Sequence, residues 1–376
     1  MQSIALHCIA LHRPNLFMLP AMRRTAPPNP EQDAPAQAAR SASLADVASL
    51  AGVSAGTVSR ALSRPTMISL ATRERVLAAA KHLGYVANGA ARALAMRRTM
   101  TVGAIVPRFG SSSFPKMIQA LESTLAAKGY TLLLAAPEHN NVHEGTLLRT
   151  LLERGVDAVA LLGSQHPQDV FELLETHRTP YVMMWSAPSD AGPSVGFDES
   201  AASALLIEHL GSLRHRCIGF IGGRTADNER AQRRLQGLTQ AIARRGLVLC
   251  EAALIETDYG FREGFEAMCE ILSRRTEVTA VVCGNDYLAA GALSALNRAN
   301  VSVPGQISIA SFNDNDFAPF LHPPLSTVRL PIQRMGELAG AYLLASLQNG
   351  KPPAPALLDV ELIVRCSTGP CPSKAI

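Results

Sequence analysis

Residues 43–98 are predicted to form three short helices joined by tight turns, and this pattern constrains the fold more than any other stretch. Ser43 and Asp46 have the spacing of a capping box, which begins the first helix. Gly52 is expected to end that helix, because glycine adopts a left-handed C-cap without a Cβ clash. Ser54 then caps a second helix after only a few residues. Two helices joined in this way form a helix-turn-helix.

The second helix has an apolar face and a face of small and polar residues. Val58, Ala61 and Leu62 recur at helical spacing and are expected to pack inward. Small outward residues let a helix approach the floor of the DNA major groove, where Arg60 could grip guanine O6 and N7. Hydroxyl groups suit phosphate oxygens, which position a protein without reading sequence. The predicted DNA contacts of this helix are Ser54, Ala55, Gly56, Thr57, Ser59 and Arg60.

A third helix is predicted to begin at Ser69, and it completes the small bundle. Its spacing of apolar residues is helical, so one face should pack on the first two helices. The residues expected to be buried are Val76, Leu77, Ala80 and Leu83.

The three-helix bundle could bind DNA, or it could be a helical bundle without DNA function in which Arg60 is merely solvated. The distribution of charge helps to decide between these two interpretations. Residues 40–100 hold nine Lys and Arg against two Asp and Glu, whereas the whole chain has a net charge of only +4. The rest of the chain is therefore mildly acidic. A basic module on an acidic body is typical of a nucleic-acid-binding protein, so duplex DNA is the predicted partner.

The same residues carry longer motifs. They are D-V-A-x-x-A-G-V-S-x-x-T-V-S-R-x-L, T-R-E-R-V-x-x-A-A, L-G-Y and N-x-x-A-R-x-L, in this order and with fixed spacing. Together they make the segment resemble the lactose-repressor (LacI/GalR) family of bacterial transcription regulators. The resemblance implies a sequence-specific regulator, a repressor, that binds a palindromic operator as a homodimer.

The resemblance also implies a hinge helix over Asn88–Met96 that folds on the operator. Leu94 would act as an apolar wedge in the minor groove, a known way to bend DNA; the alternative is that it packs on its own protein. Asn88 can cap such a helix, which is too short to be stable in isolation. The family's usual proline is replaced by Ala87, which indicates a looser hinge. With Ser43, the predicted hinge contacts Asn88, Ala91 and Leu94 complete the DNA-binding set.

From Met100 onward, short apolar runs rich in β-branched residues alternate with helical patterns. Strands that are apolar throughout, separated by amphipathic helices, imply parallel sheets covered on both faces. The series is too long for one ordinary sheet, so the predicted fold class is α/β, with two doubly wound parallel-sheet lobes behind an all-α headpiece. Ligands of such sheets bind beyond the carboxyl ends of the strands, here in the cleft between lobes. Helices are expected over Phe114–Lys128, Gly145–Arg154 and Glu199–Gly211.

These changes of pattern predict four segments. Residues 1–42 form a flexible extension, 43–87 the DNA-binding domain, 88–99 the hinge and linker, and 100–376 the effector-binding and dimerisation domain. Lobe one is expected to comprise about 100–212 and 326–350, and lobe two about 213–325 and 351–367. No leucine heptad follows the last strand, which favours a dimer over a tetramer.

The extension is not expected to span a membrane or to direct export. Thr25–Ala42 is rich in Pro, Ala and Gln, and Ile4–Leu19 is apolar only in part, with no basic segment before it. This stretch is too interrupted to span a bilayer and makes a poor signal peptide. Met22 is an alternative start. The seven cysteines lack a C-x-x-C pair and are expected to be small core residues in a reducing cytoplasm.

The larger domain also resembles the LacI/GalR family, through the matches Gly196–Asp198, Arg214–Gly223, Arg234–Gly237, Asn285–Leu293 and Pro323–Arg329. This resemblance implies a region similar to periplasmic sugar-binding proteins, with three crossovers between lobes and an effector in the cleft. Arg234 would grip effector hydroxyls, and most relatives carry Asp where Asn313 stands. The effector-binding positions implied are Arg108, Phe114, Asp198, Arg234, Tyr259, Asn285 and Asn313.

Each of these positions has a simpler interpretation. Arg234 could be a surface cation beside Arg233, and Tyr259 could be core packing. Asn313 and Asp314 could cap a turn, as Asn and Asp often do. Their joint spacing with the predicted strand ends favours a binding pocket.

Arg108 predicts the chemistry of the effector. An arginine after the first strand, facing Arg234, would favour a carboxylate through paired charge-assisted contacts. The effector is therefore predicted to be an acidic or phosphorylated sugar, such as an aldonate.

Catalysis finds little support, and no cofactor is predicted. The chain has no H-E-x-x-H and no glycine loop ending in G-K-[ST]. His139 and His143 could bind a metal on a helix, but their surroundings indicate a loop. One alternative to a transcriptional regulator is a periplasmic-type sugar-binding protein without DNA function, which the basic N-terminal module disfavours. A second alternative is an enzyme with a regulatory domain, which would need catalytic motifs.

Overall fold

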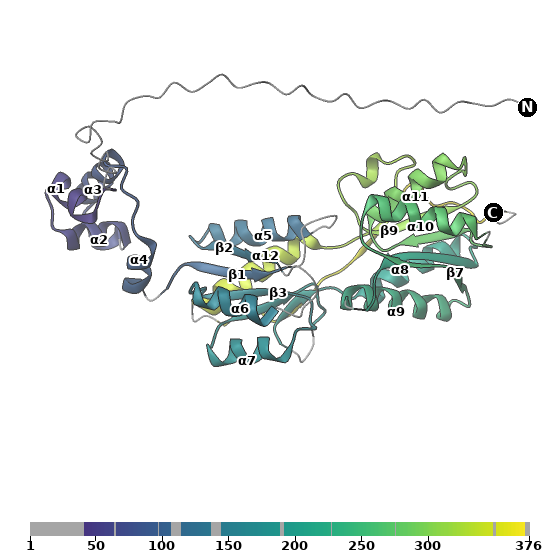
Figure 1. Cartoon of the computed structure of the whole chain (residues 1–376), viewed down its shortest axis with the longest axis horizontal. Helices are drawn as coiled ribbons and strands as arrows, with labels where there is room; N and C mark the ends of the chain where they lie inside the picture. The colour runs from purple at the N-terminus through teal and green to yellow at the C-terminus, as the bar shows by residue number, and fades with distance from the viewer. Residues whose placement is uncertain are drawn as a thin grey trace, which may run out of the picture. The chain divides into compact units, whose positions relative to one another are not determined.

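The computed structural model describes residues 41–63, 65–96, 98–106, 114–136, 144–188, 192–226, 228–274, 276–348 and 351–372. The chain divides into two compact units, Met1–Ala87 and Asn88–Ile376, and Figure 1 labels many of their helices and strands. Most of the predicted extension, together with His139 and His143, lies outside the described residues.

The first unit contains three short helices around a small apolar core. Val47, Val58 and Val76 meet there without solvent exposure. The predicted burial of Leu77 is wrong: its side chain is 44% exposed, and Ala79 faces inward instead. A single step along a helix turns the side chain by about 100°, so Leu77 points away when Val76 points in. The elements are α1 (Leu44–Ala51), α2 (Ala55–Ser63), the 3-10 turn η1 (Pro65–Met67) and α3 (Leu70–His82).

Local hydrogen bonds fix the ends of these helices as the sequence predicts. Ser43 Oγ accepts from Asp46 N at 3.3 Å, and the Asp46 carboxylate accepts from Ser43 N at 2.7 Å, which completes the capping box. Gly52 has a φ of 63° and ends α1 in the left-handed conformation. Ser54 and Ser69 cap α2 and α3 through their hydroxyl oxygens.

The second unit holds two six-stranded sheets, each covered by helices. Their strand orders are β11-β5-β4-β3-β1-β2 and β12-β10-β9-β8-β6-β7. Neighbouring strands are parallel, except that β12 runs antiparallel to β10. We call the first sheet with its helices lobe one, and the second sheet with its helices lobe two. The predicted fold class is therefore confirmed.

Lobe one has a hydrophobic sheet between two pairs of helices. Strand β3 is buried at every residue, and α5 packs against α12 on one face of the sheet. Its strands are β1 (Thr101–Ile105), β2 (Thr131–Ala135), β3 (Ala158–Leu162), β4 (Tyr181–Met184), β5 (Ser194–Gly196) and β11 (Ala356–Leu357). Its helices are α5 (Phe114–Ala126), α6 (Glu144–Glu153), α7 (Gln168–Thr176) and α12 (Ile332–Leu347).

Lobe two repeats this construction, with α10 packed on α11 and α8 on α9. Its strands are β6 (Cys217–Gly223), β7 (Val248–Thr257), β8 (Ala280–Cys283), β9 (Ser308–Asn313), β10 (Ser326–Arg329) and β12 (Glu361–Ile363). Its helices are α8 (Glu199–Ser212), α9 (Glu229–Arg244), α10 (Phe261–Ser273), α11 (Asp286–Arg298) and the 3-10 turn η3 (Ala318–Phe320). Among the residues described, no helix is long and apolar enough to cross a membrane.

The chain passes between the lobes at three places, but not at the predicted residues. Residues 199–212 form α8, which packs against α9, β10 and β12 and so belongs to lobe two. Strand β10 pairs with β9 in lobe two, whereas β11 pairs with β5 in lobe one. The predicted lobe boundaries at 212, 326 and 351 are therefore wrong. Strands this short carry no signal of which sheet they join, because both sheets accept the same apolar residues.

Cysteines are less buried than predicted. Of those the structure describes, Cys283 is buried, but Cys269 and Cys366 are exposed, and all are free thiols. Their role as core residues is thus correct only in part.

Asp286, the first residue of α11, is fully buried and joins this helix to two strands. Its carboxylate accepts from Ser311 Oγ on β9, from Thr327 Oγ1 on β10 at 2.9 Å, and from N and Nδ2 of Asn315 at 2.6 and 3.0 Å. Burial raises the pKa of Asp286 to about 6, because desolvation outweighs these four hydrogen bonds.

The stability of the wild type relative to Asp286→Asn should fall as the pH rises from about 4 to about 6. Folded Asp286 keeps its proton up to about pH 6, while an unfolded aspartate loses it at about pH 3.9. The folded state therefore binds more protons in this window, and its relative free energy of unfolding declines by roughly 3 kcal/mol. Urea denaturation of both proteins across this range measures the difference; a constant difference would contradict the raised pKa.

Candidate functional site

The exposed face of α2 holds the residues predicted to contact DNA. Arg60 lies back over Gly56 and donates to Thr57 Oγ1 at 3.5 Å. Within the described part of the chain it has no carboxylate partner, so its guanidinium is not neutralised by a neighbouring acid. Ser54 is used as a cap, since its hydroxyl accepts from Thr57 N at 3.1 Å. As predicted, Ala55, Gly56, Ser59 and Arg60 are exposed, with Thr57 half-buried beside them.

A short helix, α4 (Gly89–Met96), follows at the predicted hinge. Asn88 Oδ1 accepts from Ala90 N at 2.9 Å, which confirms that Asn88 caps this helix. Leu94 is 84% exposed, so in this structure it does not pack on its own protein. Ala91 lies within the helix, but its side chain is outside the described part of the structure.

Arg234 lies in the interior of the large unit, and the surface-cation interpretation is wrong. The residue is 4% exposed. Its Nε and Nη2 donate to the two carboxylate oxygens of Glu199 at 2.9 and 2.8 Å, and Nη1 donates to Gly284 O. The guanidinium also stacks on Phe312, 4.5 Å from the ring centroid. Burial disfavours the charge, but Glu199 more than offsets this, so the pKa of Arg234 is raised.

Lobe one contributes aromatic side chains to this pair. Trp185, directly after β4, donates from Nε1 to Glu199 Oε1 at 3.1 Å. Phe114, at the start of α5, packs edge-on against Trp185 with 5.2 Å between ring centroids. The predicted residue Phe114 therefore lies close to the Glu199–Arg234 pair, at the carboxyl ends of the lobe-one strands.

Tyr259 packs over two glycines beside Arg234. A Cβ added to Gly223 would stand 2.4 Å from the tyrosine ring, and one on Gly284 would stand 3.3 Å from it. Burial, opposed by the charge of Arg234, raises the pKa of Tyr259. The interpretation of Tyr259 as packing is correct in part, because it also adjoins the core of lobe two.

The two predicted asparagines lie at neighbouring strand ends of lobe two. Asn285 is buried and caps α11, with Oδ1 accepting from Leu288 N at 2.9 Å. Asn313 ends β9 and is 8% exposed, and its Oδ1 has no hydrogen-bond partner among the described residues. A buried acceptor without a donor is unfavourable, so Asn313 is suited to receive one from a ligand.

Asp198 is not brought into this group. Asp198 is exposed and caps α8 by accepting from Ser200 N at 2.7 Å, while its neighbour Glu199 turns inward to Arg234. Arg108 lies outside the described residues.

A second contact between the lobes is absent from the predictions. Glu229, the first residue of α9, accepts from Ser164 N at 2.8 Å, from Gln165 N at 2.9 Å and from Ser164 Oγ. Its carboxylate also pairs with Arg233 at 2.6 Å. Burial raises the pKa of Glu229, but these hydrogen bonds and the Arg233 charge outweigh it and lower the pKa.

Sequence reasoning therefore missed Glu199, Glu229, Arg230 and Trp185. Two signals could have pointed to them. Arg230 and Arg234 have the i, i+4 spacing of one helix face, and Trp185 is the chain's single tryptophan, placed at a predicted strand end.

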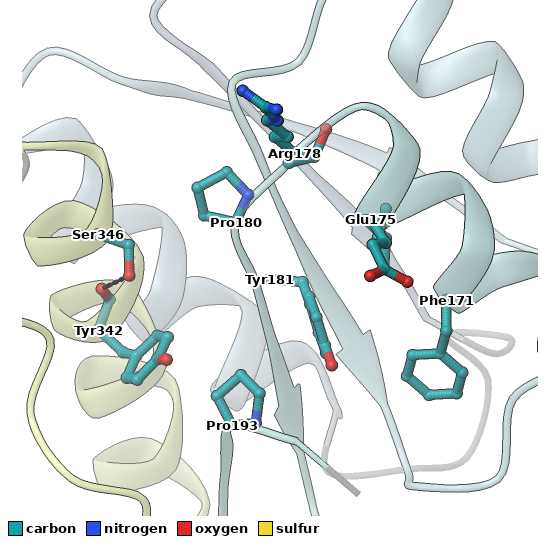
Figure 2. A pocket seen from close by; sticks show the side chains of 10 residues that line it. Phe171, Glu175, Arg178, Pro180, Tyr181, Pro193, Tyr342 and Ser346 are labelled. Atoms are coloured by element: carbon teal, nitrogen blue, oxygen red, sulfur yellow. Dashed lines mark hydrogen bonds between the residues drawn. The ribbon is translucent and has the colours of Figure 1, made fainter.

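A separate cavity of about 530 Å³ lies in lobe one. It is at the amino ends of the strands, whereas the Glu199–Arg234 pair is at their carboxyl ends. Figure 2 shows Tyr181 and Tyr342 on its walls, with Pro193 between them and Glu175 on the neighbouring helix. It lies at the amino ends of β4 and β5, and none of the predicted site residues that the structure describes lines it.

Comparison with known proteins agrees with both halves of this description. Residues 43–88 match the bacterial regulatory proteins of the lacI family, and residues 207–368 match the periplasmic binding protein-like domain. The chain is similar to the HTH-type transcriptional repressor CytR of Escherichia coli K12, with 34% identity over 333 residues, 88% of this chain and 97% of the relative. The ribose operon repressor of the same organism is 33% identical over 300 residues, 79% of this chain and 91% of the relative.

A solved structure shows the same likeness. The lac repressor dimer bound to operator and the anti-inducer ONPF matches with a TM-score of 0.78 and 26% identity, covering 88% of this chain and all 100% of that one.

Replacing Glu199 by Gln should lower the free energy of unfolding by roughly 3–5 kcal/mol, because it leaves Arg234 buried without its carboxylate. Urea denaturation followed by circular dichroism measures this loss. Glu208→Gln, an exposed change on the same helix, is the control and should cost less than about 0.5 kcal/mol. Equal losses in the two variants would show that the pair does not support the fold.

Proposed function

The chain belongs to the LacI family of bacterial regulatory proteins, and from this we propose a homodimeric repressor that reads a palindromic operator under the control of a small effector. That it is a DNA-binding transcriptional repressor with a periplasmic binding protein-like domain follows from the family itself. The dimer, the operator symmetry and the effector are the proposed parts. Like its repressor relatives, it would act without catalysis, in the cytoplasm where its DNA lies.

The observation that carries this proposal is the exposed face of α2 on a basic three-helix unit. Two such units in a dimer would enter successive major grooves, so the symmetry of the operator would match that of the protein. Residues 43–87 would bind these half-sites. Residues 88–99 would form the hinge, where two copies of the exposed Leu94 enter the minor groove. The proposed DNA contacts remain Ser43, Ser54, Ala55, Gly56, Thr57, Ser59, Arg60, Asn88, Ala91 and Leu94.

The effector would bind in the cleft of residues 100–376, where Phe114, Arg234 and Tyr259 converge. Asn313 Oδ1 has no hydrogen-bond partner among the described residues, which supports a ligand that carries hydroxyl groups. We retain an acidic or phosphorylated sugar as the proposed class, with Arg108, Asp198 and Asn285 as further proposed contacts. Binding would change the angle between the lobes and shift hinge folding by a coupling of about 1–3 kcal/mol.

Selection of bound fragments from a random duplex library tests sequence-specific DNA binding. A thermal-shift screen of neutral and acidic sugars then identifies effectors. Operator affinity measured with and without each hit then tests control by the effector. Purified protein with no preference for any duplex would refute the proposal, and tight binding of a neutral pentose or hexose would refute the acidic class.

Arg60→Ala should relax sequence preference at one base pair of each half-site and cost about 1–3 kcal/mol of operator binding. The loss follows from removing a bidentate contact to guanine. Arg75→Ala, an exposed change on α3, is the matched control and should affect all sequences alike. Binding measured on a set of single-base operator variants distinguishes the two; unchanged preference in Arg60→Ala would assign base reading elsewhere.

Leu94→Ala should weaken operator binding while leaving effector affinity unchanged, because it removes the apolar wedge from an exposed position outside the cleft. Gel-shift titration and calorimetry measure the two affinities. Equal operator affinity in the variant and the wild type would show that Leu94 is not a wedge.

A further inference from the structure

Arg230 places a positive charge between the lobes. It is the second residue of α9 in lobe two, and its guanidinium lies 5.6 Å from the ring centroid of Phe114 in lobe one. A Cβ on Gly163, directly after β3, would stand 3.3 Å from Arg230 Nη1. The side chain therefore reaches the carboxyl ends of the lobe-one strands, where the cleft is expected to hold its ligand.

The two carboxylates nearest to this charge already have other partners. Glu199 accepts from Arg234 and from Trp185, and Glu229 accepts from the Ser164–Gln165 backbone and pairs with Arg233. Both attract Arg230 through space, while Arg234 repels it. Within the described ranges, no hydrogen bond or ion pair from the Arg230 guanidinium is formed, and the guanidinium faces the Phe114 ring.

This arrangement is unfavourable without a ligand. Burial lowers the pKa of Arg230, yet a guanidinium remains charged at neutral pH. Arg230 is half-buried, and a half-buried cation with unused donors loses part of its hydration without gaining a partner. An anion with two oxygens would restore both the charge balance and the hydrogen bonds.

Asn313 adds the complementary requirement. Its buried Oδ1 has no donor among the described residues, and it follows Phe312, on which Arg234 stacks. The carboxyl edge of the lobe-two sheet therefore carries an acceptor suited to a ligand hydroxyl, in addition to the Arg230 donors for a ligand anion.

We propose that Arg230 is a specificity-determining residue that binds the anionic group, a carboxylate or a phosphate, of a polyhydroxylated effector. This inference rests on the proposed effector-binding function and deepens it. In this inference the acidic group of the effector is bound by Arg230 of lobe two, whether or not Arg108 also contacts it.

A first test needs no knowledge of the effector. Arg230→Met keeps much of the side-chain length but removes the charge, so without ligand it should raise the Tm of the full chain by about 2–4 °C. Arg244→Met, an exposed change in the last turn of the same helix, should not raise it. A lower Tm for Arg230→Met than for the wild type would overturn the proposal, because it would show that the charge is already compensated.

A second test uses acetate and inorganic phosphate as probes, exchanged for chloride at constant ionic strength. Trp185 is the only tryptophan of the chain and contacts Phe114 and Glu199, so its fluorescence reports on the cleft. The wild type and Arg244→Met should respond to at least one probe, and Arg230→Met should bind it about 10- to 100-fold more weakly. A stronger response to acetate indicates a carboxylate ligand, and a stronger response to phosphate indicates a phosphorylated one.

Equal responses of the wild type and Arg230→Met, or none from the wild type to either probe, would overturn the assignment. Operator binding by gel shift separates this result from the repressor function, since Arg230→Met should still bind DNA. A wild type with an Arg230-dependent anion response but no preference for any duplex would refute the repressor function and leave the anion site standing.

Discussion

The buried pair of Glu199 and Arg234 organises the region where the two lobes meet. Arg234 uses three donors on Glu199 and Gly284, and Glu199 accepts a further hydrogen bond from Trp185 of lobe one. Neither charge is tolerable in the interior without the other, since a lone buried ion lacks both water and a counter-charge. The pair therefore fixes the first turn of α8, the middle of α9 and the end of β4 together, and the candidate effector site is built around it.

Local signals in the sequence were enough to predict the secondary structure. They were not enough to predict which strands pair over long distances in the chain. The caps at Ser43, Gly52 and Asn88 depend on residues within a few positions, so the sequence indicates them directly. The choice of sheet for β10 and β11 depends on partners far away in the chain, and these strands have only four and two residues. The elements were predicted well, whereas the places where the chain changes lobes were not.

The same distinction applies to the candidate site. Motif matches indicated Arg234, Tyr259 and Asn313, and the structure places them at strand ends of lobe two or beside them. Glu199 was missed in favour of Asp198 because an acid in the first turn of a helix is usually an exposed partner of the helix dipole. Only tertiary contacts distinguish the exposed cap from the buried counter-charge one residue later.

Control by an effector must act against the contacts that join the lobes. Two carboxylates of lobe two, Glu199 and Glu229, accept hydrogen bonds from Trp185, Ser164 and Gln165 of lobe one. Changing the angle between the lobes would strain or break these charge-assisted bonds. A ligand can shift the arrangement only through a difference in its affinity for the two states. A ligand held by Arg230 and lying against Phe114 would contact both lobes at once, so its binding energy would depend on their separation, which is the condition for coupling the cleft to the DNA-binding unit.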